Sequence, residues 1–177
     1  MKLIKTPIKG LLIIKQKNNT DNRGNLRETF NSKILKKKFV FEYCTSSKKN
    51  VLRGFHFQSK FQQSKYVNVI KGKILDVVID LRKRSKTFGK IFKIILSKKN
   101  AIGLFIPKGF AHAYYSFDKE NVIYYKLDNF YMPKYETGII YNDKDLKVKW
   151  PRKKMIISKK DKSLLTFKNF RKVLSGL

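Results

Sequence analysis

This chain has 177 residues, 42% of them hydrophobic and 14% aromatic, enough to bury the core of one folded domain and to exclude a disordered basic tail. Its formal net charge of +30 is typical of nucleic-acid-binding proteins, but the 42 lysines and arginines are spread along the whole sequence instead of forming one basic stripe. Residues encoded by AT-rich codons are all abundant, so genome composition accounts for the charge, and nucleic acid is not the expected partner.

The first residues, MKLIKTPIKGLLIIKQKNN, contain a short apolar run without the small-residue cleavage site of a signal peptide. No segment has the roughly 18 consecutive apolar residues that span a bilayer. Cys44 is the single cysteine, which excludes a disulfide framework and favours a reducing compartment. The sequence therefore predicts a cytoplasmic protein without a membrane partner.

Two helices and a series of short strands are expected. The first helix is expected over residues 27–39, where RETFNSKILKKKF follows Gly24 and has apolar residues at helical spacing. NVLRGFHFQ, residues 50–58, is the first strong strand-like stretch. Further strands, rich in β-branched and aromatic residues, are expected at 65–72, 73–81, 90–97, 103–109, 112–117 and 121–127. The second helix is expected over residues 161–177.

The connections between these strands are short, and no long helical pattern separates them. This arrangement is typical of an all-β sandwich or barrel built from hairpins. The sequence has no internal repeat and no linker. We therefore expect one antiparallel β domain over residues 1–177, with the two short helices at its periphery.

His56 and His112 are the only histidines of the chain. Each could be a buried core histidine held by one hydrogen bond. A metal site is not favoured, because the usual sites need three or four ligands at close spacing and the two histidines are far apart in sequence. Cys44, in EYCTSS, lacks the glycine turn of a nucleophile, and KGK and FGK are too short for a phosphate-binding loop.

Metal-free acid–base chemistry remains. Histidine suits a general base near neutral pH, and its ring needs an orienting carboxylate, for which Asp161 is available. The segment VIYYKLDNFYMP supplies Tyr124, Tyr125 and Tyr131 as possible acids, since tyrosine keeps its proton to a pH of about 10. Alternation along a strand sends Tyr124 and Tyr125 to opposite faces, so only one can face the interior, and simple packing is the alternative role.

Several segments together resemble one enzyme family. In order and spacing, the motifs NVLRGFHFQ, then Lys65, GKILDVVIDLRKRSKTFGK, LFIPKGFAHAYY, YYKLDNFYMPKYETGIIYNDKDLKVKWP and ISKKD are similar to those of dTDP-4-dehydrorhamnose 3,5-epimerases. The resemblance runs from about residue 20 to residue 162. It implies a cupin-type antiparallel β-jelly-roll that works as a homodimer with neither metal nor coenzyme. It also implies a place in bacterial dTDP-L-rhamnose biosynthesis, which supplies surface polysaccharides such as the O-antigen.

The substrate implied by this resemblance is a nucleotide-linked 4-keto-6-deoxy hexose. Its C4 ketone acidifies the hydrogens on C3 and C5, because the carbanion delocalises into the carbonyl oxygen. The resemblance makes His56 the base and Asp161 the group that holds its ring. Lys65 corresponds to the cation beside the enolate oxygen, and Tyr125 to the acid that protonates the opposite face.

The resemblance also implies residues that bind the substrate. Arg53 corresponds to a second cationic contact with sugar or phosphate. His112 corresponds to another active-site histidine, with Asp76 as its partner. Two further positions, Arg23 and Glu28, lie in DNRGNLRETF, which matches the family stretch D-x-R-G-x-F-x-E near the nucleotide. Tyr131 is the remaining expected substrate contact.

Three alternatives stay open from the sequence. The enzyme could invert only C3 or only C5, or it could act on another nucleotide sugar. The chain could instead be a non-catalytic cupin-like binding protein. A binding protein has no need of the complete acid–base set, so the sequence favours the enzyme; this set consists of Arg53, His56, Lys65, Tyr125 and Asp161.

Overall fold

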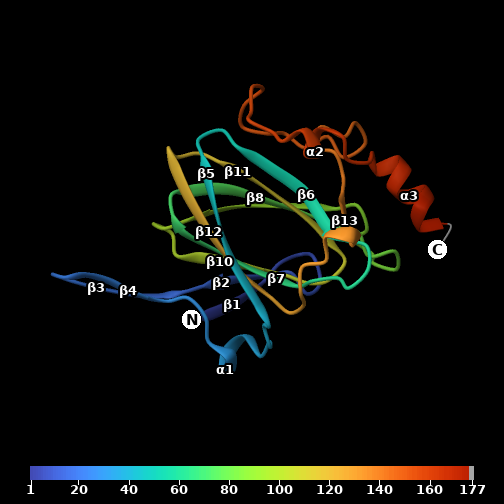
Figure 1. Cartoon of the computed structure of the whole chain (residues 1–177). Coiled ribbons are helices and arrows are strands. Elements are labelled where there is room, and N and C mark those ends of the chain that lie inside the picture. Colours follow the sequence, from blue (N-terminus) through green and yellow to red (C-terminus); the bar gives the residue numbers. More distant parts are fainter. Residues whose placement is uncertain (176–177) are drawn as a thin grey trace.

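The computed structural model describes residues 1–175 and contains two antiparallel sheets that pack face to face, with a separate hairpin (Figure 1). The larger sheet has the spatial order β1 (Lys2–Lys5), β2 (Leu12–Lys15), β10 (Ile102–Ile106), β7 (Lys65–Lys71), β12 (Glu120–Leu127) and β5 (Phe41–Lys48). The smaller sheet has the order β13 (Glu136–Gly138), β6 (Leu52–Gln58), β11 (Phe110–Ser116), β8 (Lys73–Asp80) and β9 (Ile91–Ser97). The hairpin consists of β3 (Lys17–Asp21) and β4 (Gly24–Glu28), and a 3-10 helix, η1 (Pro133–Tyr135), precedes β13. The all-β, cupin-type jelly-roll expected from the sequence is confirmed.

The main apolar core lies between the two sheets. Val67 and Ile123 reach it from the larger sheet, and Ile74 and Val78 reach it from the smaller one. Alternate residues of each strand point inward, so every second position is apolar and buried. Along β12 this alternation is regular. The interior side chains of the two sheets therefore face each other, and a polar group among them faces the opposite sheet.

A second apolar cluster covers the outer face of the smaller sheet. Phe55 and Val77 on the strands pack against Trp150, Phe167 and Phe170 from the C-terminal segment. This cover buries β11 along its whole length. The C-terminal segment is thereby fixed against β6, which becomes important for the site described below.

All six strands expected between residues 65 and 127 are present as β7 to β12, with small differences at their ends, and the 50–58 stretch contains β6. Strands β1 to β5 and β13 were outside these expectations. Within residues 1–175, no helix is both long enough and apolar enough to span a bilayer.

The helix expected over residues 27–39 is wrong for most of its length. Residues 27 and 28 complete β4, and only α1 (Ser32–Leu35) is helical. Asn31 caps the start of α1, and Lys36, in the left-handed region with φ of 49°, ends it after one turn. The rest of the segment has no regular secondary structure, and its Phe30 and Phe39 rings pack on each other and on Tyr66 of the larger sheet.

The helix expected over residues 161–177 is divided in two. A short helix, α2 (Lys159–Lys162), is followed by an extended link and then by α3 (Phe167–Ser175). The link is extended because the Leu165 carbonyl accepts a hydrogen bond of 2.8 Å from the backbone N–H of Ile140. Residues 176–177 of the expected helix lie outside the described part of the chain.

Candidate active site

His56 on β6 and Asp161 in α2 form a hydrogen-bonded pair. His56 Nε2 lies 2.8 Å from Asp161 Oδ1, and the backbone N–H of Gly54 donates to Asp161 Oδ2 at 3.0 Å. Burial alone would raise the pKa of Asp161, but the hydrogen bonds from His56, Gly54 and Ser158 outweigh it and hold the pKa below its usual value. The ionised carboxylate fixes the imidazole through Nε2 and leaves Nδ1 as the ring nitrogen without this partner.

Two glycines allow the close strand approach around His56. Gly54 has φ of +115°, and a Cβ there would lie 2.5 Å from the His112 carbonyl oxygen. Gly138 is paired with His56 across β13 and β6, and its Cβ would lie 1.9 Å from the Phe55 carbonyl oxygen. Any larger residue at either position would displace a neighbouring strand. These glycines therefore set the position of the His56 backbone.

His112 lies directly beside His56. The two residues are partners in the β6–β11 ladder, so their side chains occupy the same face of the smaller sheet. His112 Nε2 lies 2.8 Å from Asp76 Oδ2 on β8, and both side chains are buried. The structure thus brings together two histidine–carboxylate pairs, including the pairing of His112 with Asp76 expected from the sequence.

Tyr125 enters the interior from the opposite sheet. Its ring centroid lies 6.1 Å from that of His112 and stacks on Tyr43 at 4.7 Å. Burial raises the pKa of Tyr125 well above its usual value, so the phenol keeps its proton at neutral pH. Tyr124 points to the other face of β12, where its hydroxyl donates to Glu42. The alternation expected from the sequence is confirmed, and Tyr125 is the residue of this pair that faces the interior.

A cavity of about 320 Å³ lies next to these groups; His56, Lys65, Tyr43, Gln58, Tyr131 and Glu136 are among its lining residues. Burial lowers the pKa of Lys65 to about 8, although Glu136 and Asp76 act in the opposite direction. Glu136 accepts hydrogen bonds from Tyr131, at 2.8 Å, and from Lys160. The cavity is therefore lined by an imidazole, an amine and a carboxylate within one small volume.

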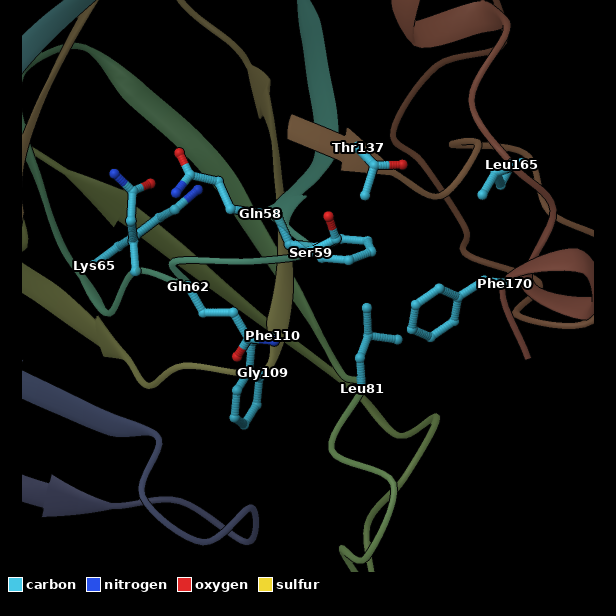
Figure 2. Close-up of a pocket in the computed structure, with 12 residues that line it drawn as sticks. Gln58, Ser59, Gln62, Lys65, Leu81, Gly109, Phe110, Thr137, Leu165 and Phe170 are labelled. Atoms are coloured by element: carbon cyan, nitrogen blue, oxygen red, sulfur yellow. The ribbon is translucent and has the colours of Figure 1, made fainter. Parts of the chain in front are cut away.

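A second cavity of about 270 Å³ adjoins the first and shares Phe57, Gln58, Gln63 and Lys65 with it. Figure 2 shows Lys65 and Gln58 together on one side of this cavity, and Leu165 and Phe170 on the other. Its lining is mostly apolar. Among the residues that the structure describes, Lys65 is the only ionisable one in this lining, whereas the first cavity also has His56, Tyr43, Tyr131 and Glu136 and is the better candidate for acid–base chemistry.

Arg53 connects the two sheets near this interior. It lies on β6, and its guanidinium donates to Ser47 Oγ on β5 at 3.1 Å and to the Ser46 carbonyl oxygen at 3.2 Å. The residue is exposed to solvent. It is therefore available to an anionic ligand at the edge of the interior.

Arg23 and Glu28 do not reach the cavity within one chain. Figure 1 shows the β3–β4 hairpin extending away from the two sheets. At the turn of this hairpin, the Arg23 side chain is 85% exposed and binds Asp21. Glu28 accepts a hydrogen bond of 2.7 Å from Asn31. Their assignment to the nucleotide end of a substrate stays a prediction.

Sequence reasoning missed Glu136, Lys160, Tyr43 and Gln58. Gln58 Nε2 donates to the Phe61 carbonyl oxygen at 2.7 Å, and its Oε1 accepts from a backbone N–H, so this side chain holds two loops at the cavity. Glu136 and Lys160 are distant in sequence, and only the tertiary structure brings their side chains into contact. One signal was available for Glu136, because the chain has only 12 carboxylates against 42 basic residues.

Comparison with known proteins gives consistent matches. The family model described as dTDP-4-dehydrorhamnose 3,5-epimerase matches residues 5–169. The dTDP-4-dehydrorhamnose 3,5-epimerase of Methanothermobacter thermautotrophicus is 41% identical over 170 residues, which cover 92% of each chain.

Two solved structures described as 3,5-epimerases of dTDP-linked sugars are also similar. The dTDP-4-dehydrorhamnose 3,5-epimerase of Elizabethkingia anophelis has a TM-score of 0.89 and 38% identity, covering 96% of this chain and 97% of its own. The epimerase of Legionella pneumophila, solved in complex with dTDP-4-keto-L-rhamnose, has a TM-score of 0.89 and 37% identity, covering 93% and 92%.

Proposed function

The chain belongs to the dTDP-4-dehydrorhamnose 3,5-epimerase family, and from this premise we propose that its own side chains invert C3 and C5 of dTDP-4-dehydro-6-deoxyglucose to give dTDP-4-dehydro-L-rhamnose. The ligand of the Legionella pneumophila structure supports a dTDP-linked 4-keto sugar. The observation that carries the mechanism is the arrangement of His56 on one sheet, held by Asp161 of α2, and a buried Tyr125 on the facing sheet.

In the first step of this mechanism, His56 removes the proton from a carbon beside the C4 ketone. The Asp161 carboxylate stabilises the imidazolium that forms. The electron pair moves into the ketone oxygen, and the Lys65 cation in the same cavity stabilises the enolate. Among residues 1–175, no group of three or more His, Cys, Asp or Glu is arranged to hold a metal ion, and the proposed steps use side chains alone.

In the second step, Tyr125 donates its proton to the carbon from the opposite face, which inverts the centre. Tyr125 comes from the larger sheet and His56 from the smaller one, so a flat enolate between them is accessible from both faces. His112 and Arg53 are proposed contacts to the sugar or phosphate. Tyr131 lines the cavity and is a third proposed contact.

A homodimer is also part of the proposal. The β3–β4 hairpin holds Arg23 and Glu28 away from the cavity of its own chain. In the proposed homodimer, Arg23 and Glu28 of one chain reach the cavity of the second copy and contact the nucleotide there.

Reaction in D₂O tests the proposed function. With dTDP-4-keto-6-deoxyglucose as substrate, NMR should find deuterium at both C3 and C5 of the product, at an unchanged rate in the presence of a strong chelator. Label at one carbon would replace the proposal with a single-centre epimerase. No label, together with binding of the nucleotide, would favour a non-catalytic binding protein.

The rate should also fall as the pH rises through about 8, because burial lowers the pKa of Lys65 to about 8. The cation is present below that pKa and is lost above it, so enolate stabilisation is lost in the same range. The pH profile of kcat measures this descending limb. Lys65→Arg keeps its charge and should move the limb to higher pH; an unmoved limb would assign it to another group.

A further inference from the structure

Tyr125 needs a source of protons, and this requirement rests on the function proposed above. Each inversion leaves His56 protonated and Tyr125 without its proton. The Tyr125 residue is only 3% exposed, so bulk water has little direct access to its oxygen. A second inversion in the same substrate requires the phenol to be restored first. The structure must therefore provide a path for a proton.

A row of hydroxyl groups begins at Tyr125. Thr45 lies on β5 two residues from Tyr43, which is directly opposite Tyr125, so the Thr45 and Tyr125 side chains are diagonal neighbours on the same face of the larger sheet. Hydrogen bonding from the Thr45 side chain partly offsets the rise in the pKa of Tyr125. Thr45 Oγ1 lies 3.1 Å from the Tyr114 hydroxyl, which lies 2.8 Å from Ser47 Oγ. Both of these separations are within hydrogen-bonding range, and either oxygen of each pair can be the donor. The row therefore runs from β12 to β5, on to β11 and back to β5.

The outer end of the row reaches an exposed residue. Ser47 is 4% exposed and Tyr114 is 3% exposed, whereas Arg53 is exposed to solvent. The Arg53 Nε–H donates to Ser47 Oγ at 3.1 Å and leaves the Ser47 proton free to be donated to the Tyr114 hydroxyl, 2.8 Å away. The permanent charge of Arg53 beside Ser47 favours the arrangement in which each hydroxyl of the row donates toward Tyr125.

We propose that Thr45, Tyr114 and Ser47 form a proton relay that restores Tyr125 from solvent after each inversion. The Tyr125 oxygen takes the Thr45 proton, Thr45 takes that of Tyr114, and Tyr114 takes that of Ser47. Ser47 then takes a proton from water beside Arg53, and His56 releases one proton to water. The protons balance over the cycle, and no oxidation or reduction occurs.

Tyr114→Phe tests the relay because it removes one hydroxyl and keeps the ring in the core. In rapid-quench experiments the first inversion at each active site uses the proton already on Tyr125, so its rate should stay within about twofold of wild type. All later inversions should be slower by about 10²-fold, which is the lower end of the range for a removed proton-transfer group. The time course of inverted sugar should begin with a burst of one inversion per active site. Sugar that is inverted at only one carbon should accumulate after this burst.

Four further variants distinguish a relay from a packing role. Tyr115→Phe is the matched control, because the Tyr115 hydroxyl donates to Asn50 at 2.6 Å outside the row, and it should behave as wild type. Thr45→Val should reproduce the burst, and Thr45→Ser should restore steady turnover. The double variant Tyr114→Phe, Thr45→Val should be no slower than the slower single variant, because one missing link already interrupts the row.

Two results would overturn the relay while the proposed function stands. One is an unchanged steady rate in Tyr114→Phe. The other is a first inversion that slows as much as the later ones, which would make Tyr114 a residue that only positions Tyr125. If the wild-type protein inverts neither carbon, the proposed function itself fails, and the relay fails with it.

Discussion

Exchange of the C3 and C5 hydrogens with solvent should stop when His56 is replaced by alanine. The variant lacks the only group proposed to remove either proton, and general-base catalysis contributes about 10²- to 10⁴-fold. Both carbons should lose exchange together, because one base serves both. NMR of the recovered sugar in D₂O measures the two positions separately.

Two controls separate this role from a structural one. The His56→Ala variant should still bind dTDP and unfold at nearly the same temperature, because the imidazole is only partly buried, with 26% of its side chain exposed. His56→Gln keeps a polar side chain beside Asp161 but supplies no base, so it should be equally inactive. Continued exchange in either variant, at a rate near that of wild type, would remove His56 from the base position.

Tyr125→Phe should separate proton removal from product formation. His56 can still form the enolate and return a solvent proton to the same face, so hydrogen exchange into the unreacted substrate continues. Inversion needs a donor on the other face, and product formation should fall by about 10²-fold or more. The ratio of exchanged substrate to product, measured by NMR in one reaction, should therefore rise steeply.

Tyr124→Phe is the matched control for this experiment. The Tyr124 hydroxyl belongs to the adjacent residue on the same strand but donates to Glu42 on the other face of the sheet. Its removal should leave the ratio of exchange to product unchanged. If Tyr125→Phe slows exchange and product formation equally, the phenol is not the acid for the second step.

Strand periodicity was sufficient to predict the part of the fold that forms the interior. The stretch from residue 65 to residue 127 alternates or stays apolar over short segments, and β7 to β12 follow it closely. The same alternation assigned Tyr125 and Tyr124 to opposite faces, as observed. The pairing of His56 with Asp161 did not follow from periodicity, since the two residues lie on separate elements and were linked only through the family resemblance.

Other features of the structure could not be predicted from the local sequence pattern. All residues of β3 and most of β4 are exposed, so no hydrophobic period marks the hairpin, and the helical spacing from residue 27 onward gave the wrong assignment. Phe30 and Phe39 lie within that stretch, but their rings pack on each other and on Tyr66 of the larger sheet instead of on one face of a helix. The contact of Glu136 with Lys160 depends on where the C-terminal segment crosses β13, which only tertiary packing decides.

The sandwich architecture gives the proposed mechanism its stereochemical basis. Side chains that point inward from facing sheets approach a bound molecule from opposite sides, and the outer cover of the smaller sheet positions Asp161 behind His56. A flat enolate that gains its new proton from the second sheet cannot regain the one taken by the first. Inversion then follows from the arrangement of the sheets.

The first molecules of product formed in D₂O test this claim most directly. If His56 and Tyr125 act on opposite faces, the hydrogen removed from the substrate never returns to the inverted carbon, and mass spectrometry should find no residual protium there. Substrate-derived protium retained at that carbon would mean that a single group removes and returns the proton, which would contradict the two-sided mechanism.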